Sequence, residues 1–81
     1  MSINELLDNV KDESTFLEFV KALKEDFNVH RSEWENGTID QFLESAIAWS
    51  EDSNFGSDQG LKDASAWKKI AVFLYSGKIY E

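Results

Sequence analysis

The amino-acid sequence predicts an all-α fold, a compact bundle of three main helices preceded by a short N-terminal helix. Apolar residues recur in four segments at the three- and four-residue spacing of one helical face. Polar residues that commonly cap helices precede several of these segments. The chain contains no proline, a residue that interrupts helices. Its 81 residues are enough for a single domain, residues 1–81.

The first predicted helix runs from Ser2 to Val10. Ser2, followed by Glu5 three residues later, is the pattern of a capping box. Its apolar residues share one helical face: Ile3, Leu6, Leu7 and Val10. Because a helix of two or three turns is not stable alone, we expect it to dock against the rest of the chain.

The second predicted helix begins near Asp12 or Ser14, either of which can act as the cap, and ends near Phe27 or Asn28. One face carries a continuous set of apolar side chains: Phe16, Phe19, Val20, Leu23 and Phe27. The opposite face is charged, as expected for a helix with one solvent-exposed side.

The third predicted helix begins after Thr38, with Gln41 in the position that completes a capping box. Its expected core stripe consists of Ile39, Phe42, Leu43, Ala46 and Ile47, and Trp49 lies at the edge of that stripe. Residues 51–60 are rich in glycine and small polar side chains, so they predict a loop. Phe55 is the one large apolar residue in this loop and is expected to pin it to the core.

The fourth predicted helix runs from about Asp63 to Ser76, with Gly77 as the residue that ends it. The apolar run Ile70–Tyr75 also fits a strand that turns back at Ser76-Gly77, but Trp67 extends the helical period and favours the helix. The predicted core of the bundle is drawn from three helices: Phe16, Val20, Leu23, Phe27, Phe42, Leu43, Ile47, Trp67, Ile70, Ala71 and Leu74.

The composition argues against an enzyme and predicts no cofactor and no metal site. A net charge of −8 repels nucleic acids and anionic membranes. The chain has no cysteine and a single histidine, His30, which leaves no nucleophile–base pair. The loop from Asp52 has oxygen ligands at alternate positions, as a calcium loop does, but Ser57 stands where that motif needs glycine and Asp63 where it needs glutamate.

The leading functional hypothesis is a non-catalytic module that binds another protein. Trp34, Trp49 and Phe73 are the candidate partner-binding residues, since aromatic side chains at the edge of a core often form interfaces. For Trp34 and Trp49 the sequence leaves core packing open as well; Trp34 is placed to pack across the start of the third helix. The alternatives are an immunity-type inhibitor of a basic toxin, a small ligand- or metal-sensing domain built on the 52–63 loop, and a small enzyme with paired carboxylates. No signal peptide or membrane span is evident, so a cytoplasmic location is expected.

Spaced aromatic anchors mark the second half of the chain. The pattern is Trp34-x-Asn36-x-Thr38-Ile39-x-x-Phe42-Leu43-Glu44, then Trp49, then Ser65-x-Trp67-x-x-x-Ala71, and finally Ile79-Tyr80-Glu81. It resembles the pattern of a small bacterial domain family of unknown function. The resemblance implies a bacterial cytoplasmic domain that stands alone, and it assigns no activity, cofactor or site residue.

Overall fold

A computed structural model describes residues 2–80 of the chain. They form four α-helices and no strand, so the all-α prediction is confirmed and the strand alternative for the apolar run in the last helix is wrong. The helices are α1 (Ile3–Asp8), α2 (Glu13–Val29), α3 (Ile39–Asp52) and α4 (Ala66–Ile79). Two short 3-10 turns, Arg31–Glu33 and Ser57–Gln59, lie in the connections after α2 and α3.

Each α-helix begins at a polar side chain that accepts a hydrogen bond from the first turn. Ser2 and Glu5 form the predicted capping box, and Asp12 forms another with Thr15. The Thr38 side chain accepts from the Gln41 N–H at 3.2 Å, as expected for the start of α3. The fourth helix starts later than predicted because Ser65, which accepts from the N–H of Lys68, supplies its cap.

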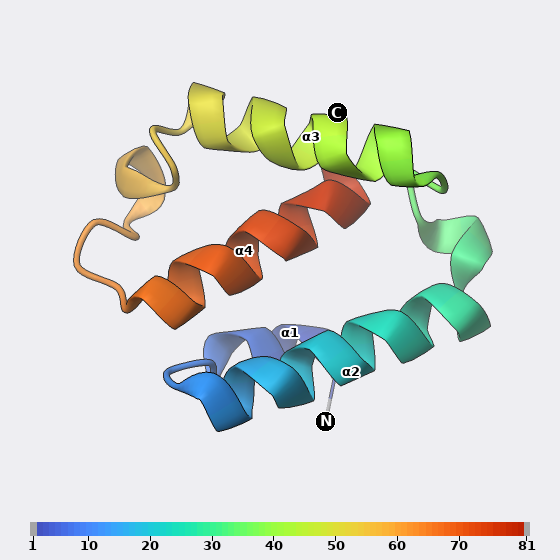
Figure 1. Ribbon diagram of the computed structural model, residues 1–81, viewed down its shortest axis with the longest axis horizontal. Coiled ribbons are helices and arrows are strands. Elements are labelled where there is room, and N and C mark those ends of the chain that lie inside the picture. Colours follow the sequence, from blue (N-terminus) through green and yellow to red (C-terminus); the bar gives the residue numbers. More distant parts are fainter. Residues whose placement is uncertain (1, 81) are drawn as a thin grey trace.

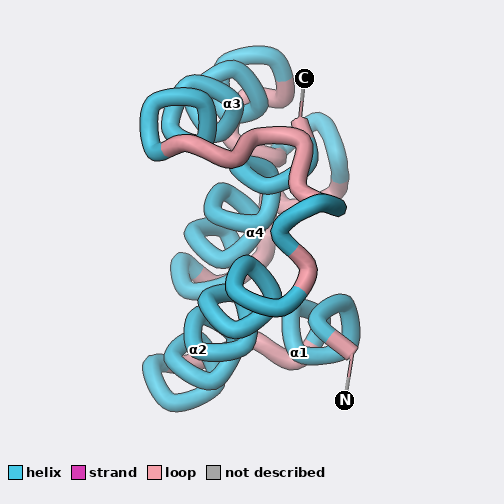
Figure 2. Tube along the Cα trace, turned by 90° about the vertical axis from the view of Figure 1, so that its right-hand side faces the viewer, coloured by secondary structure: helices cyan, strands magenta, loops and turns pink. Residues whose placement is uncertain are grey.

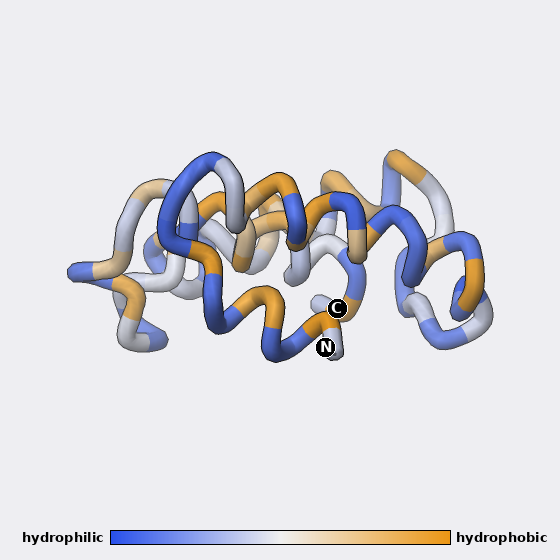
Figure 3. The backbone as a smooth tube through the Cα atoms, turned by 90° about the horizontal axis from the view of Figure 1, so that it is seen from below, coloured by the Kyte–Doolittle hydropathy of each residue, from blue (hydrophilic) through white to orange (hydrophobic). Residues whose placement is uncertain are grey.

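The three long helices lie side by side in one layer, with α4 in the middle (Figure 1). Among the described residues the backbones of α2 and α3 do not meet, and each of these helices packs on α4 instead. The short α1 covers only one side of the layer, beside α2 (Figure 2). The Cα atoms therefore extend 33 × 27 × 16 Å, and Figure 3 shows the thin dimension edge-on.

One long cation from α4 helps to hold α1, whose apolar side chains Ile3, Leu6 and Leu7 pack against the core. Lys68 Nζ donates to the carbonyls of Leu7 and Asp8, the last two of α1, at 2.8 and 2.7 Å, and the Leu7 carbonyl also accepts from the Val10 N–H at 3.2 Å. Val10, just past this turn, is buried against Phe19 and Ala71. The expected docking of the N-terminal helix is thus confirmed.

The face that α3 turns toward α4 is made of small side chains, and this corrects the predicted core. Ser45 and Ala46 of α3 are buried, as are Ala71, Ser76 and Gly77 of α4. Small residues let two helices approach closely, so the interface forms on this side of α3. The predicted core members that remain exposed are Leu43 (47%), Ile47 (50%), Trp67 (39%) and Ile70 (44%), and Ile39 of the predicted α3 stripe is 79% exposed. The other predicted core residues are buried or half-buried.

Gly77 lies inside α4 and does not end the helix, which continues to Ile79. A Cβ atom at this position would lie 2.7 Å from Cε1 of the Phe42 ring. The glycine is therefore required for the close approach of α3 to α4, and Tyr80 takes the C-cap position in its place.

The connection after α3 folds back over Trp49. Asn54, Phe55 and Gly56 adopt left-handed backbone angles in succession, which reverses the chain. The Phe55 ring stacks on Phe73 at 5.6 Å and meets Trp49 edge-on at 5.6 Å. Phe55 therefore pins the loop to the core, as expected from the sequence.

Candidate functional site: an open apolar face beside an aromatic junction

The chain between α2 and α3 crosses the end of the bundle and is fixed there by Trp34. The indole packs edge-on against Phe27 of α2, with ring centroids 4.9 Å apart, and stacks on Phe42 of α3 at 6.1 Å. Phe42 is the fourth residue of α3, so Trp34 packs across the helix start, as the sequence suggested. We call this end of the molecule the junction: Asp26, Phe27, Trp34, Asn36, Thr38, Phe42 and Lys78.

A largely buried ion pair lies beneath the Trp34 indole in the junction. Lys78 Nζ is 2.7 Å from Asp26 Oδ2, and the two side chains are 12% and 17% exposed. The same carboxylate oxygen accepts the Trp34 Nε1–H at 2.8 Å. Burial raises the pKa of Asp26, but the hydrogen bonds from Lys78 and Trp34, together with the positive charge of Lys78, outweigh it, so the pKa lies below its ordinary value.

Asn36 joins the same junction to the end of α4. Its side-chain amide donates to the carbonyls of Gly77 and Tyr80, both at 3.1 Å. These carbonyls belong to the last turn of the helix and have no partner within it. The Tyr80 hydroxyl donates to Asp52 Oδ2 at 2.5 Å, which raises the pKa of Tyr80.

The spaced pattern of the sequence therefore has a structural explanation. Trp34 binds α2 to α3, Asn36 caps α4, and Thr38 caps α3. Tyr80 ties the end of α4 to the end of α3. Glu81, the last residue of the pattern, lies outside the described residues.

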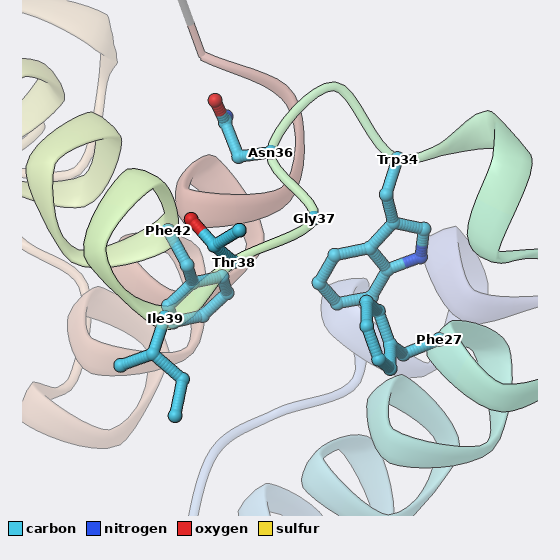
Figure 4. A pocket seen from close by; sticks show the side chains of 7 residues that line it. All are labelled: Phe27, Trp34, Asn36, Gly37, Thr38, Ile39 and Phe42. Atoms are coloured by element: carbon cyan, nitrogen blue, oxygen red, sulfur yellow. The ribbon is translucent and has the colours of Figure 1, made fainter.

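A pocket of about 180 Å³ opens beside the Trp34 ring (Figure 4). Phe27 and the indole form one wall, and Ile39 and Phe42 of α3 form the other. Its accessible surface is almost wholly apolar. Such a pocket is suited to one large apolar side chain.

A second apolar hollow of about 240 Å³ continues from this pocket along α2 and α4. It shares Phe27, Trp34 and Phe42 with the first and adds Val20, Leu23, Lys24 and Leu74. Residues four apart share a helical face, so Leu43 and Ile47 lie on the side of Ile39, and Ile70 lies on the side of Leu74. We call this surface the open face: Val20, Phe27, Ile39, Leu43, Ile47, Ile70 and Leu74.

The open face lies on the side of the layer away from α1. Lys68, which binds α1, and Ile70 are two residues apart on α4 and so point about 200° apart around the helix. Helix α1 therefore covers the side of the layer that is opposite to the open face.

The two long edges of the open face carry opposite charges. Lys24 lines the hollow on the α2 side, and Lys21 lies one turn before it. On α3 the exposed Asp40 is one turn before Leu43 and so lies beside the Leu43 and Ile47 stripe, whereas Glu44 lines a hollow on the other side of the helix with Gln41, Ser45 and Ala48. Within residues 2–80 none of these four charged groups has an ion-pair partner.

The three candidate partner-binding residues do not form one site. Trp34 is half-buried in the junction, whereas Phe73 lies half-buried near the loop at the far end of α3, stacked on Phe55. Trp49 is only 3% exposed, and its indole N–H donates to Gln59 Oε1 at 2.9 Å. It is a core residue, since the folded-back loop covers it and leaves no area for a partner.

Sequence reasoning missed Leu43, Ile47 and Ile70 as surface residues because they had been assigned to the core. One signal points to them. The apolar sector of α3 runs from Trp49 through Phe42 and Ala46 to Ile47 and spans about 160° of the helix circumference. A single neighbouring helix covers only part of so wide a sector.

The open face offers apolar area and edge charges, and the groups that suggested other chemistry lie elsewhere. His30 is exposed at the end of α2, with Nδ1 3.2 Å from Glu33 Oε2. Among residues 2–80 no three potential metal ligands cluster together. In the same range no helix has both the length and the apolar character needed to cross a membrane.

A protein-family model covers residues 12–81, which include the junction, the open face and all three long helices. The chain belongs to a family of unknown function, DUF7660. The resemblance seen in the sequence is thereby confirmed at the level of a family without an assigned activity, and α1 lies outside the matched region. No match was found among curated proteins or among solved structures.

Proposed function

We propose that this member of DUF7660 is a non-catalytic protein-binding module and that its open face is the binding surface. The observation that carries the proposal is the row of half-exposed aliphatic side chains, Leu43, Ile47 and Ile70, beside an apolar pocket. Monomeric proteins seldom expose contiguous apolar surface of this kind unless a partner covers it.

The energetics support a complex of moderate affinity. Covering the exposed half of each aliphatic side chain is worth about 1 kcal/mol, and filling the pocket at Trp34 adds the burial of one large partner side chain. The charged edges of α2 and α3 add little free energy but select the orientation of the partner. Burial on this scale must first offset an association cost of several kcal/mol.

A narrower form of the proposal is an immunity-type inhibitor whose partner is a basic toxin. It rests on the net charge of −8 and on α3, whose four charged side chains are all acidic: Asp40, Glu44, Glu51 and Asp52. A complex of this form should weaken strongly as salt is added.

We also propose that the protein resides in the bacterial cytoplasm. The chain has no cysteine, so its fold needs no oxidising compartment. Fractionation of the source cells, followed by immunoblotting, tests this part, and recovery in another compartment would contradict it.

The test compares two lysine substitutions of exposed apolar residues. Ile47→Lys changes the open face, whereas the matched control Val29→Lys changes an exposed position on the side of α2 that carries α1, away from the open face. A partner captured by the tagged wild-type protein is purified and titrated against both variants by calorimetry. We expect the control to bind as the wild type does and Ile47→Lys to bind at least about tenfold more weakly, since a charge would enter an apolar contact. Equal binding by both variants, or no self-association and no partner at all, would contradict the proposal.

A further inference from the structure

We propose that the occupant of the open face is a second copy of the same chain, docked face to face about a two-fold axis parallel to the long helices. This inference rests on the proposed function, because it names the partner of the same surface. Three features of the molecule support it: the depth of the helix layer, the size of the face and the signs of its edge charges.

The long helices form a single layer that lacks a cover on one side. Stable domains bury each apolar helix stripe between at least two packed layers. Here α1 supplies a partial second layer on one side only, and the thin dimension of the molecule is 16 Å. The stripe of Leu43, Ile47 and Ile70 on the other side has no layer above it. A second copy would supply one, and its own open face would be covered in the same contact.

The area of the face suits a stable dimer. The layer extends 33 by 27 Å, so its projected face is about 900 Å². A specific interface of standard size buries about 800 Å² on each partner. Two copies in contact over the whole layer, with the two open faces at the centre, would reach this size with an apolar centre and charged edges, the composition typical of protein interfaces.

The edge charges select how the second copy is turned. The helices α2 and α3 are joined by the short segment 30–38, so the C-terminal half of α2 and the N-terminal half of α3 lie at the same end of the molecule (Figure 1). Lys24, in the C-terminal half of α2, is therefore at the same end as Asp40 of α3, which lies on the opposite edge. Rotation about an axis parallel to the helices keeps that end in place and exchanges the two edges.

In this orientation α2 of one copy lies over α3 of the other. Lys24, which lines the hollow, then faces Asp40 of the second copy, and the symmetry forms the same contact twice. A two-fold axis across the helices would instead place α3 over α3 with its ends exchanged, so Asp40 would lie over the acidic end of the second α3, Glu51 and Asp52, which is repulsive. The apolar area supplies the association free energy against the like net charges of −8, and the edge charges fix the orientation.

The experiment reverses the charge of each edge separately and then mixes the two proteins. One variant carries Lys24→Glu, and the other carries Asp40→Lys. We expect the wild type to sediment as a dimer over a dilution series in analytical ultracentrifugation. Each variant alone sets like charges against each other, so its dimer dissociation constant should rise by about tenfold or more. An equimolar mixture should recover the wild-type affinity, because every edge contact then pairs opposite charges.

Circular dichroism confirms that each variant is folded, and Val29→Lys serves as the control that keeps the dimer. A dimer whose affinity is the same in the mixture as in the separate variants would overturn the proposed orientation. A wild type that stays monomeric at every concentration would overturn the second copy as the occupant. In that case, a captured partner that still discriminates Ile47→Lys from Val29→Lys would leave the proposed function standing. The loss of that discrimination as well would overturn both.

Discussion

The junction and the open face adjoin one another, yet they are built in opposite ways. In the junction the Trp34 N–H, the Asn36 amide, the Asp26 carboxylate and the Lys78 ammonium all have hydrogen-bond or ion-pair partners. On the open face, large aliphatic side chains stay half in solvent beside charges that have no partner within residues 2–80. The comparison indicates that the spaced aromatic pattern maintains the fold, while the proposed binding surface beside it takes little part in it.

The same contrast runs around α3 itself. The side that meets α4 carries small residues such as Ala46, whereas Leu43 and Ile47 project from the uncovered side. Trp49, the largest side chain of α3, is buried, but Leu43 and Ile47 stay half exposed although their burial would contribute more to the fold than that of Ala46. The arrangement of α3 thus favours a role for the exposed side in binding.

The comparison predicts the largest effect for Trp34→Ala. This change removes the ring that lies between Phe27 and Phe42. It also removes the hydrogen bond that Asp26 accepts from the Trp34 indole N–H. We expect a loss of about 3–5 kcal/mol in the free energy of unfolding, typical of a large aromatic deleted from a packed site. Urea denaturation followed by circular dichroism measures it. An 81-residue domain has a total stability of only about 4–12 kcal/mol, so much of the variant should be unfolded.

Trp67→Ala is the matched control for this prediction. Trp67 is also a tryptophan in contact with a phenylalanine, Phe16, but 39% of it is exposed and its indole lies outside the junction. Its removal should cost clearly less than that of Trp34. Equal losses for the two variants would remove the special role assigned to the junction.

The next largest effect is expected for Lys78→Met, and this effect depends on pH. The substitution leaves Asp26 partly desolvated with only the Trp34 N–H, so stability at neutral pH should fall by about 2–3 kcal/mol. The pKa of Asp26 is lower in the folded protein than in the unfolded chain. The ion pair therefore stabilises the fold above about pH 4 and loses its effect as the pH falls through the folded-state value.

The stability difference between wild type and Lys78→Met should narrow below about pH 4. Denaturation curves at neutral and acidic pH measure it. A difference that stays constant with pH would mean that Lys78 acts through the packing of its aliphatic chain and not through its charge.

Much of the fold could be predicted because its signals are local. Ser2, Thr38 and the periodic face of α2 lie within a few residues of the structure that they specify. The covered side of α3 was predicted wrongly for a different reason. A helical wheel gives the width of an apolar sector, but the covered half depends on where α4 lies, and that depends on contacts distant in the sequence.

The role of Gly77 also depends on a contact distant in the sequence. A glycine near the end of a helix matches a local C-cap signal, so the sequence predicts that Gly77 ends the helix. The contact with Phe42 that requires it joins positions that are far apart in the chain. The open face was likewise hidden, because an exposed Leu43 and a buried one look the same in the sequence.

A smaller effect is expected for Gly77→Ala at the boundary between the junction and the small-residue interface. The new methyl group would press on the Phe42 ring and cost about 2 kcal/mol. Alanine favours helix over glycine by about 1 kcal/mol, which offsets part of that cost. The net loss of about 1 kcal/mol, measured by urea denaturation, should disappear when Phe42→Ala is present, because the clash is then absent. A stabilised Gly77→Ala single variant would show that close approach is not the reason for this glycine.

The smallest effect on stability is expected for Ile47→Lys, and it gives the sharpest contrast with Trp34→Ala. Ile47 is already half exposed and has no partner group in the junction. At concentrations where the protein is monomeric, the free energy of unfolding should change by no more than about 0.5 kcal/mol. At higher concentrations the wild type should gain stability through association, and the variant should not. Thermal denaturation over a dilution series separates the two regimes, with Val29→Lys following the wild type throughout. A large loss for Ile47→Lys in the dilute regime would instead place Ile47 among the residues that hold the monomer together, and the open face would lose its distinction from the junction.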